Sequence, residues 1–227
     1  MKIQFSANQQ YQIDATNAVV ELFNGQPQAG GVFELTMQDE GLSSLVLSET
    51  GLGNKLVITP ERLLKNCKAV QTANGIQPSH KLEMTTRDTG ELASEATDFG
   101  AAFPNFTVEM ETGTGKTYVY LRSIYELNRL YGFKKFVIVV PSVAIREGVL
   151  KNLQITHDHF QGLFSHVPCS FSVYDSAKVN SLRSFALSNA IQILVINIDA
   201  FAKDSEDAAD SGTKRTKGNV INQLRET

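Results

Sequence analysis

Two spacings of apolar residues run along this chain, and each predicts a different kind of element. Apolar side chains recur with a roughly helical period over residues 8–24, and Asn24-Gly25 would end this helix because the pair tolerates the left-handed conformation. Residues 116–131 show the same period and are followed by Gly132 as a helix stop. The spacing therefore predicts two amphipathic helices.

Continuous apolar runs mark the strands of the second half. Residues 136–140 are apolar throughout, as expected for a strand at the buried centre of a parallel sheet, and residues 191–198 form a further apolar run. Between them the pattern predicts a helix over 143–153, a strand over 170–174 and a helix over 177–189. Strands that alternate with helices in this way predict a doubly wound α/β sheet.

A less regular stretch separates the first helix from this alternating region. Residues 25–104 contain two short candidate strands, at 32–37 and 44–48, and Pro60 opens a helix that would run to about Ala73. Residues 76–104 hold few large apolar groups and many Ser, Thr, Asp and Gly, which predicts an insertion or a mobile loop.

These patterns divide the chain into five parts. They are an N-terminal helix (1–24), an insertion (25–104), an α/β core (105–202), a flexible loop (203–218) and the start of a truncated helix (219–227). The flexible loop is predicted from its mixed charge and its near absence of apolar residues.

Composition narrows the class of protein. The 227 residues are 42% hydrophobic and 20% charged, which is typical of a soluble globular protein with a sizeable core. The net charge of −3 gives no general attraction to nucleic acid, so any DNA contact would come from a local patch. No apolar run reaches membrane-span length, and the N-terminus lacks the apolar core of a signal peptide. Cys67 and Cys169 match no metal or redox spacing and predict buried thiols in a reducing cytoplasm.

Residues 110–117, Met-Glu-Thr-Gly-Thr-Gly-Lys-Thr, carry the strongest chemical signal. The turn Gly113-Thr114-Gly115 lets backbone N–H groups converge on phosphate oxygens without interference from Cβ atoms. Lys116 can then reach the β- and γ-phosphates of a nucleotide, and the Thr117 hydroxyl can bind Mg²⁺. The helix that starts at Lys116 would direct its N-terminus at the anion.

The surroundings of this loop narrow the class further. Residues 106–108 are a short strand candidate directly before it. A glycine-rich turn with an incidental Lys-Thr is the alternative, but such a turn would require neither the strand nor the helix. The standard loop has Gly five residues before Gly115, where this chain has Met110. A non-Gly residue at that position is typical of helicase-like ATPases of the second superfamily.

Longer strings around the loop are more specific than the loop itself. They are METGTGKTYVYLR and KKFVIVVPSVAIREGV, followed by HDHF, VYDSAKV and ILVINIDAF. These strings resemble the restriction (Res) subunit of type III restriction-modification enzymes. The resemblance implies a RecA-like P-loop NTPase lobe with a mainly parallel sheet, incomplete here, with an insertion before the loop. It also implies a motor with two such lobes and a nuclease domain, which uses ATP and Mg²⁺ and cuts double-stranded DNA with a methylating Mod subunit.

The same resemblance implies roles for two groups in the nucleotide site. Residues 113–117 match motif I, which binds the nucleotide phosphates and Mg²⁺. Tyr11-Gln12 is similar to the adenine-reading Gln motif, and a Gln amide can pair with both N6 and N7 of adenine. A solvated helix residue is the alternative for Gln12.

A third group matches motif Ia, which contacts the DNA backbone in such motors. It comprises Pro141, Ser142 and Arg146. A Ser hydroxyl, the N–H groups of a helix N-terminus and an Arg all suit contact with phosphate. The alternative is a strand-to-helix turn followed by a surface Arg.

Part of the expected ATP site is not found in the sequence. Phosphoryl transfer in this class needs a second acidic motif, with an Asp for Mg²⁺ and a Glu for the attacking water. Asp199 follows an apolar run but precedes Ala200, so we interpret this run as the strand before that motif, with Asp199 as a Mg²⁺ ligand the alternative. A second motor lobe and a nuclease motif are not found either. We therefore expect an N-terminal fragment that binds nucleotide weakly and hydrolyses it poorly or not at all.

Three further polar groups receive simpler interpretations. His157 and His159 are two residues apart and converge poorly on a metal, which predicts solvated or capping roles. The basic residues at 214–217 are predicted to lie in a solvated loop, since acidic residues at 204–210 offset them. Lys134 and Lys135 precede a strand and are predicted to be surface residues.

The sequence leaves three other functions open. They are a lobe of a DNA repair or remodelling helicase, a non-catalytic remnant that docks on a methylating partner, and a small nucleotide kinase. A repair helicase would share motif I but would not need PSVAIREGV and VINIDAF, while a kinase usually carries the first Gly that Met110 replaces. DNA-stimulated ATPase activity would separate the motors from the kinase. Cleavage that requires a Mod-like partner would separate the restriction enzyme from the repair helicase.

Overall fold

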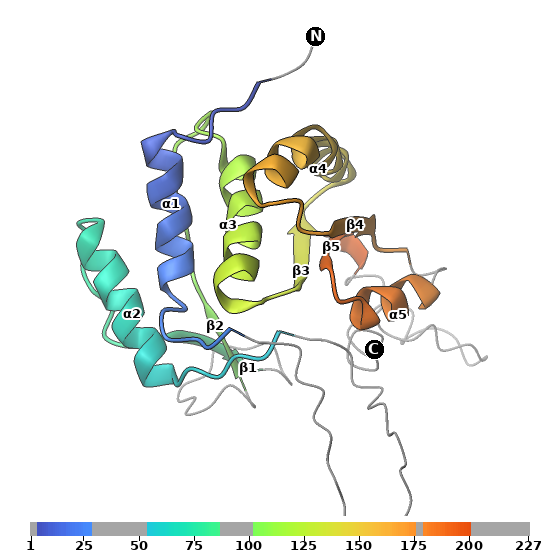
Figure 1. Ribbon diagram of the computed structural model, residues 1–227. Helices are drawn as coiled ribbons and strands as arrows, with labels where there is room; N and C mark the ends of the chain where they lie inside the picture. Colours follow the sequence, from blue (N-terminus) through green and yellow to red (C-terminus); the bar gives the residue numbers. More distant parts are fainter. Residues whose placement is uncertain (1–3, 29–53, 87–101, 176–178, 201–227) are drawn as a thin grey trace, which may run out of the picture. The chain divides into compact units, whose positions relative to one another are not determined.

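The chain forms two compact units in the computed structural model, which describes residues 4–28, 54–86, 102–175 and 179–200 (Figure 1). The first unit comprises residues 1–28 and 55–132, and the second comprises residues 29–54 and 133–227. Several predicted segments lie outside the described residues: the strands at 32–37 and 44–48, the loop at 203–218 and the helix at 219–227.

Three helices form most of the first unit: α1 (Gln10–Glu21), α2 (Pro60–Ala73) and α3 (Lys116–Tyr131). α1 packs mainly against α3 and also contacts α2, so it lies between them (Figure 1). Thr59 starts α2 because its hydroxyl accepts a hydrogen bond from the Arg62 N–H at 3.3 Å. Gly132, with φ of 72°, ends α3 in the left-handed conformation. The predicted helices over 60–73 and 116–131 are confirmed.

A buried cluster joins α2 to the end of α1. Its members are Leu22, Ile58, Leu63 and Cys67. Buried Asn66 adds polar contacts, because its side-chain amide donates to the carbonyls of Leu22 (2.9 Å) and Asn24 (2.8 Å). These carbonyls lie just beyond the last turn of α1, where the helix itself offers no donors. α3 is tied to α1 in a similar way, since the Tyr131 hydroxyl donates to the Val20 carbonyl at 3.1 Å.

Two strands occupy part of the stretch that was predicted to be a mobile loop. β1 (Glu83–Thr86) pairs antiparallel with β2 (Ala102–Asn105), so the alternative of a mobile loop is wrong for these segments, whereas an insertion with short strands is compatible with them. Met84 and Ala102 are almost fully buried, and burial of these side chains stabilises the strand pair within a polar stretch. The strand predicted at 106–108 is also wrong, because residues 106–110 have no regular structure and Val108 is exposed.

The second unit is built on a three-stranded parallel sheet with the order β3-β5-β4. Its elements follow one another as β3 (Lys135–Val140), α4 (Val143–Leu163), β4 (Cys169–Val173), α5 (Val179–Leu187) and β5 (Ile191–Asn197). The side chains of Ile193, Leu194, Val195 and Ile196 in β5 are at most 1% exposed. α4 packs against β3 and β5. The predicted α/β class with a parallel sheet is thereby confirmed.

Among the described strands of this sheet the central one is β5, and the prediction that residues 136–140 occupy the centre is wrong for this part of the sheet. Ile193 lies opposite both Phe136 of β3 and Phe171 of β4. β3 is an edge strand of the described sheet, with Val137 45% and Val139 50% exposed. An apolar run shows that a strand prefers an apolar environment, but strand order decides how many neighbours it has.

α4 continues to Leu163, well beyond its predicted end at residue 153. Thr156 and Phe160 are buried on the same face as Leu153, at the spacing that brings side chains onto one side of a helix. At its start, the Ser142 hydroxyl accepts a hydrogen bond from the Ile145 N–H at 3.3 Å. Burial of Phe160 therefore keeps the polar segment around His157 helical.

Candidate functional site

The turn before α3 is shaped by two glycines in the left-handed backbone conformation. Gly113 and Gly115 have φ of 84° and 85°, in the left-handed region that residues with a Cβ rarely adopt. Gly115 is the N-cap of α3, and no described side chain caps this end of the helix. The N–H groups of the first turn are therefore available to an anion, and the helix dipole favours negative charge there.

Three hydrogen bonds to the Glu111 carbonyl hold this turn together. The donors are the Thr114 N–H (3.4 Å), the Thr114 hydroxyl (2.7 Å) and the Lys116 ammonium (2.8 Å). Lys116 is exposed, and its ammonium bonds to a neutral carbonyl. A phosphate oxygen would be a stronger partner, since a charged acceptor adds a Coulombic attraction to the ammonium that a neutral carbonyl lacks.

Gln12 lies against this turn although it is far away in the sequence. Its side-chain amide donates to the Thr114 carbonyl at 3.0 Å. A Cβ built on Gly115 would lie only 2.6 Å from Gln12 Nε2. The structure thus brings Gln12 together with residues 113–117 inside the first unit, and it favours glycine at 115 for two separate reasons.

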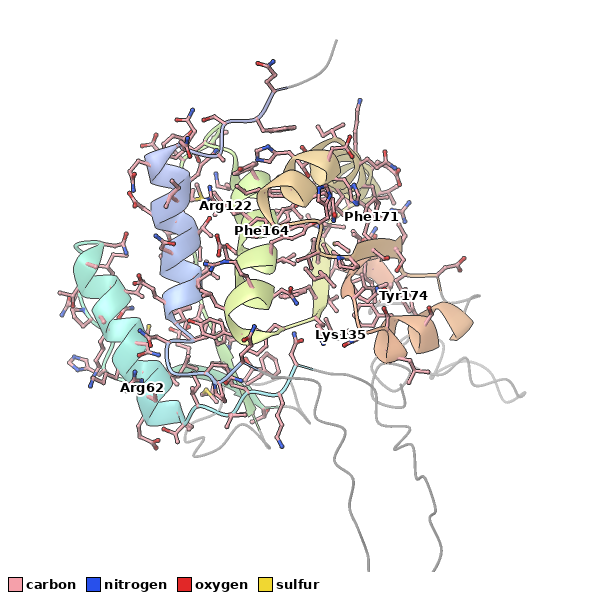
Figure 2. The ribbon with its side chains drawn as sticks, viewed as in Figure 1. Arg62, Arg122, Lys135, Phe164, Phe171 and Tyr174 are labelled. Atoms are coloured by element: carbon pink, nitrogen blue, oxygen red, sulfur yellow. The ribbon has the colours of Figure 1, made fainter. Side chains whose placement is uncertain are left out.

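The segment before α1 also contacts the start of α3, which the sequence did not indicate. The ring of Phe5 stacks on Tyr118 with centroids 6.2 Å apart. Arg122, which is labelled in Figure 2, donates to the Ala7 carbonyl at 2.7 Å. Burial raises the pKa of Tyr118, and the nearby Arg122 opposes this rise. In the sequence, the i,i+4 spacing of Tyr118 and Arg122 could have indicated that they share a face of α3. These contacts fix residues 5–12 next to the turn.

The predicted DNA-contacting residues lie in the second unit, where β3 passes into α4. Ser142 is the N-cap of α4, so its hydroxyl already has a structural function. Arg146 is paired with Glu147, with 2.8 Å between Nη2 and Oε1 and a second hydrogen bond of 3.1 Å from Nε. A phosphate would have to compete with this carboxylate for the guanidinium group.

Asp199 lies just after the carboxyl end of the central strand β5. Its side chain is exposed, and its N–H donates to the side chain of Asn197 at 3.2 Å. The carboxyl end of a strand in an open α/β sheet is the edge at which ligands bind. The location is consistent with the strand before an acidic motif and with the alternative of a Mg²⁺ ligand.

Two of the simpler predictions for the second unit need correction. Cys169 is half-buried, whereas Cys67 in the first unit is buried and its burial raises the thiol pKa. Lys135 is not a simple surface residue (Figure 2). Its ammonium bonds to the Ser188 carbonyl and lies 5.6 Å from the ring centre of Phe185. Burial and the neighbouring Lys134 lower the pKa of Lys135 to about 8.

The two histidines of α4 have the local contacts expected of solvated or capping residues. His157 and His159 both lie in α4, where His157 is 3.5 Å from the Asp158 carboxylate and His159 meets the ring edge of Phe160. Within the described ranges, no helix is both long and apolar enough to cross a membrane.

Comparison with known proteins shows which family the chain resembles. The family model described as "Type III restriction enzyme, res subunit" matches residues 6–222. The Res subunit of the type III restriction-modification enzyme EcoPI from Escherichia phage P1 is 30% identical over 159 residues, which cover 69% of this chain and 14% of that protein. The corresponding StyLTI subunit from Salmonella typhimurium is 39% identical over 112 residues, covering 41% of this chain and 11% of that protein. The matched stretch is thus a small part of each relative.

Proposed function

The chain belongs to the family of the res subunit of type III restriction enzymes, a family of helicase-like motors, and we propose that its first unit binds ATP and Mg²⁺. The observation that supports the proposal is the turn before α3, with two left-handed glycines, Lys116 beside it and an uncapped helix N-terminus among the described residues. A Cβ on Gly113 would meet no described atom within 4 Å, so space is open on this side of the turn. The residues therefore fit a nucleotide phosphate.

Each residue has a defined part in this proposal. The backbone N–H groups of Gly113, Thr114 and Gly115 bind phosphate oxygens. Lys116 leaves the Glu111 carbonyl and binds the β- and γ-phosphates, while the Thr117 hydroxyl binds Mg²⁺. The nucleotide supplies the phosphoanhydride bond whose hydrolysis would drive a motor. Gln12 reads the adenine edge, which its position against the turn supports.

For the whole protein we propose ATP-dependent cleavage of double-stranded DNA in the cytoplasm, together with a methylating Mod subunit. The family, and the identity of its relatives as Res subunits, support this proposal. Ser142 and Arg146 are the proposed contacts to the DNA backbone, since they lie at the N-terminus of α4. Cleavage of unmodified DNA that occurs without ATP, or equally well without a Mod subunit, would contradict this part.

Nucleotide binding can be tested on the 227-residue chain with a fluorescent ATP analogue and Mg²⁺. Lys116→Ala should weaken binding by about 10- to 100-fold, which corresponds to one lost charge-assisted hydrogen bond. Lys151→Ala is the matched control, because Lys151 is an exposed lysine on α4 in the other unit. Equal affinity of wild type and Lys116→Ala, or no binding by the wild type, would refute the proposed function.

A further inference from the structure

The turn before α3 holds the Gln12 side chain in one orientation. The amide nitrogen of Gln12 donates to the Thr114 carbonyl at 3.0 Å, and a carbonyl oxygen can only accept, so the nitrogen has to face the turn. The second N–H and the amide oxygen have no other partner among the described residues. Adenine presents the matching pair, an acceptor at N7 and a donor at N6, whereas guanine presents two acceptors on this edge. Selection of adenine therefore depends on how firmly Gln12 is held in place.

The start of α1, which carries Gln12, is weakly held by the helix itself. Its N-cap is Gln9, whose side chain forms no capping hydrogen bond with the described residues, and its first turn contains no acidic residue. Helix ends without a cap leave N–H groups unsatisfied and fray readily. Because Gln12 lies in the first turn of α1, fraying would displace its amide from the Thr114 carbonyl. Contacts from outside α1 are therefore needed to fix this end of the helix.

α3 supplies such contacts to the segment just before α1. Nη1 of Arg122 donates to the Ala7 carbonyl at 2.7 Å. The ring of Tyr118, one turn earlier on α3, stacks on Phe5 with centroids 6.2 Å apart. α1 and α3 also lie side by side along their length (Figure 1). A carbonyl that is fixed at Ala7 restricts the path by which the chain enters α1.

Arg122 uses only part of its guanidinium group. Its Nε atom is buried and has no hydrogen-bond partner among the described residues. A buried donor without a partner costs stability, so an apolar side chain would suit the stability of α3 better at this position. The bond from Nη1 to the Ala7 carbonyl is charge-assisted and hence stronger than a bond between neutral groups. This combination indicates that Arg122 serves to place the segment before α1.

We propose that Arg122 is a positioning residue for base selection, which acts through the Ala7 carbonyl to hold Gln12 against the phosphate-binding turn. The inference rests on the proposed nucleotide site and on Gln12 as the residue that reads adenine. Lys116 lies at the start of α3 and Arg122 lies later in the same helix, so one rigid element sets the distance between the phosphate contacts and the base contact. Arg122 does not itself contact the nucleotide.

The test measures binding of the fluorescent nucleotides mant-ADP and mant-GDP, with Mg²⁺, to the 227-residue chain. Wild type should prefer mant-ADP. Arg122→Met removes the guanidinium group but keeps a long apolar side chain. It should weaken binding of mant-ADP by about three- to tenfold, the effect of roughly one hydrogen bond, and leave the affinity for mant-GDP unchanged.

Two further variants control for the loss of charge. Arg129→Met is the matched control, because Arg129 is an exposed arginine of the same helix that pairs with Glu126, and it should change neither affinity. Arg122→Lys keeps a charged donor and should recover most of the preference for mant-ADP. A merely structural role of Arg122 predicts a different result, in which Arg122→Met weakens both nucleotides alike, and that result would overturn the inference.

A double-mutant cycle shows whether Arg122 acts through Gln12. Gln12→Ala should itself reduce the preference for mant-ADP. Addition of Arg122→Met to Gln12→Ala should cause no further loss, because substitutions that act on the same contact are not additive. A further loss of the same size in the double variant would show that Arg122 acts by another route, which contradicts the inference.

The outcomes distinguish this inference from the proposed function. If wild type and Arg122→Met prefer mant-ADP to the same degree, the inference is overturned, and the nucleotide site still stands provided that Lys116→Ala weakens both nucleotides. If wild type binds the two nucleotides equally, Gln12 does not select adenine and the inference is also overturned, while phosphate binding stands. If wild type binds neither nucleotide, the proposed function and the inference fall together.

Discussion

The structure predicts that substitution of Gly115 lowers the stability of the protein by a specific amount. Gly115→Ala would place a Cβ in a left-handed conformation, which costs about 1–2 kcal/mol for a residue other than Gly. The new Cβ would also lie 2.6 Å from Gln12 Nε2, closer than real contacts allow. Gln12 can move away because the contact is made by the end of a flexible side chain, but it then loses its bond to the Thr114 carbonyl. That loss adds about 0.5–1.5 kcal/mol.

Gly113→Ala is a matched control, because Gly113 has nearly the same φ and a Cβ there would meet no described atom within 4 Å. Both substitutions restrict the unfolded chain to the same extent, so that contribution cancels in the comparison. Gly115→Ala should therefore lower the free energy of unfolding by about 1 kcal/mol more than Gly113→Ala.

Urea unfolding followed by circular dichroism measures both values by linear extrapolation. In a Gln12→Ala background the difference between the two glycine substitutions should disappear, because Gln12 is then no longer in the way. The reasoning is refuted if the two variants are equally stable with Gln12 present, or if the difference persists without it.

Two further predictions concern the second unit. Burial lowers the pKa of Lys135 to about 8 from an ordinary value of 10.5, so the unfolded chain binds more protons than the folded chain between these pH values, and the stability of wild type relative to Lys135→Met should rise from pH 8 toward pH 10.5. The urea midpoints of both proteins at pH 7.5 and 9.5 measure this rise. Equal changes in the two midpoints would contradict the prediction. Ser142→Ala removes the hydroxyl that accepts a hydrogen bond from the Ile145 N–H, and in thermal unfolding it should lower the free energy of unfolding by about 1 kcal/mol. Ser142→Asp is the control, because Asp can also cap the helix. Equal stability of wild type and Ser142→Ala would show that this hydrogen bond contributes nothing.

Local patterns were sufficient to locate most elements. The predicted helix over 116–131 coincides with α3, because an apolar face, a preceding glycine turn and Gly132 all act within a few residues. α2 begins at Pro60 for a similar reason, since Pro is suited to the first turn of a helix. The apolar run at 191–198 became β5. Such signals depend on residues that are close together in the sequence, so they can be read from the sequence alone.

The errors arose where a distant partner decides the outcome. The extension of α4 depends on Phe160 finding a buried position, and the edge position of β3 depends on β5 entering between β3 and β4. The polar stretch at 83–86 is a strand because it pairs with residues 102–105.

For the candidate site, the sequence by itself predicted phosphate binding by residues 113–117, because glycines, a lysine and a threonine at fixed spacing have few other uses. Only the tertiary structure decided what surrounds them. It placed Gln12 against the Thr114 carbonyl, stacked Phe5 on Tyr118 and brought the Arg122 guanidinium group to the Ala7 carbonyl. The physical reason is that hydrogen bonds and side-chain packing act over a few ångströms in space, whereas a sequence records only distance along the chain.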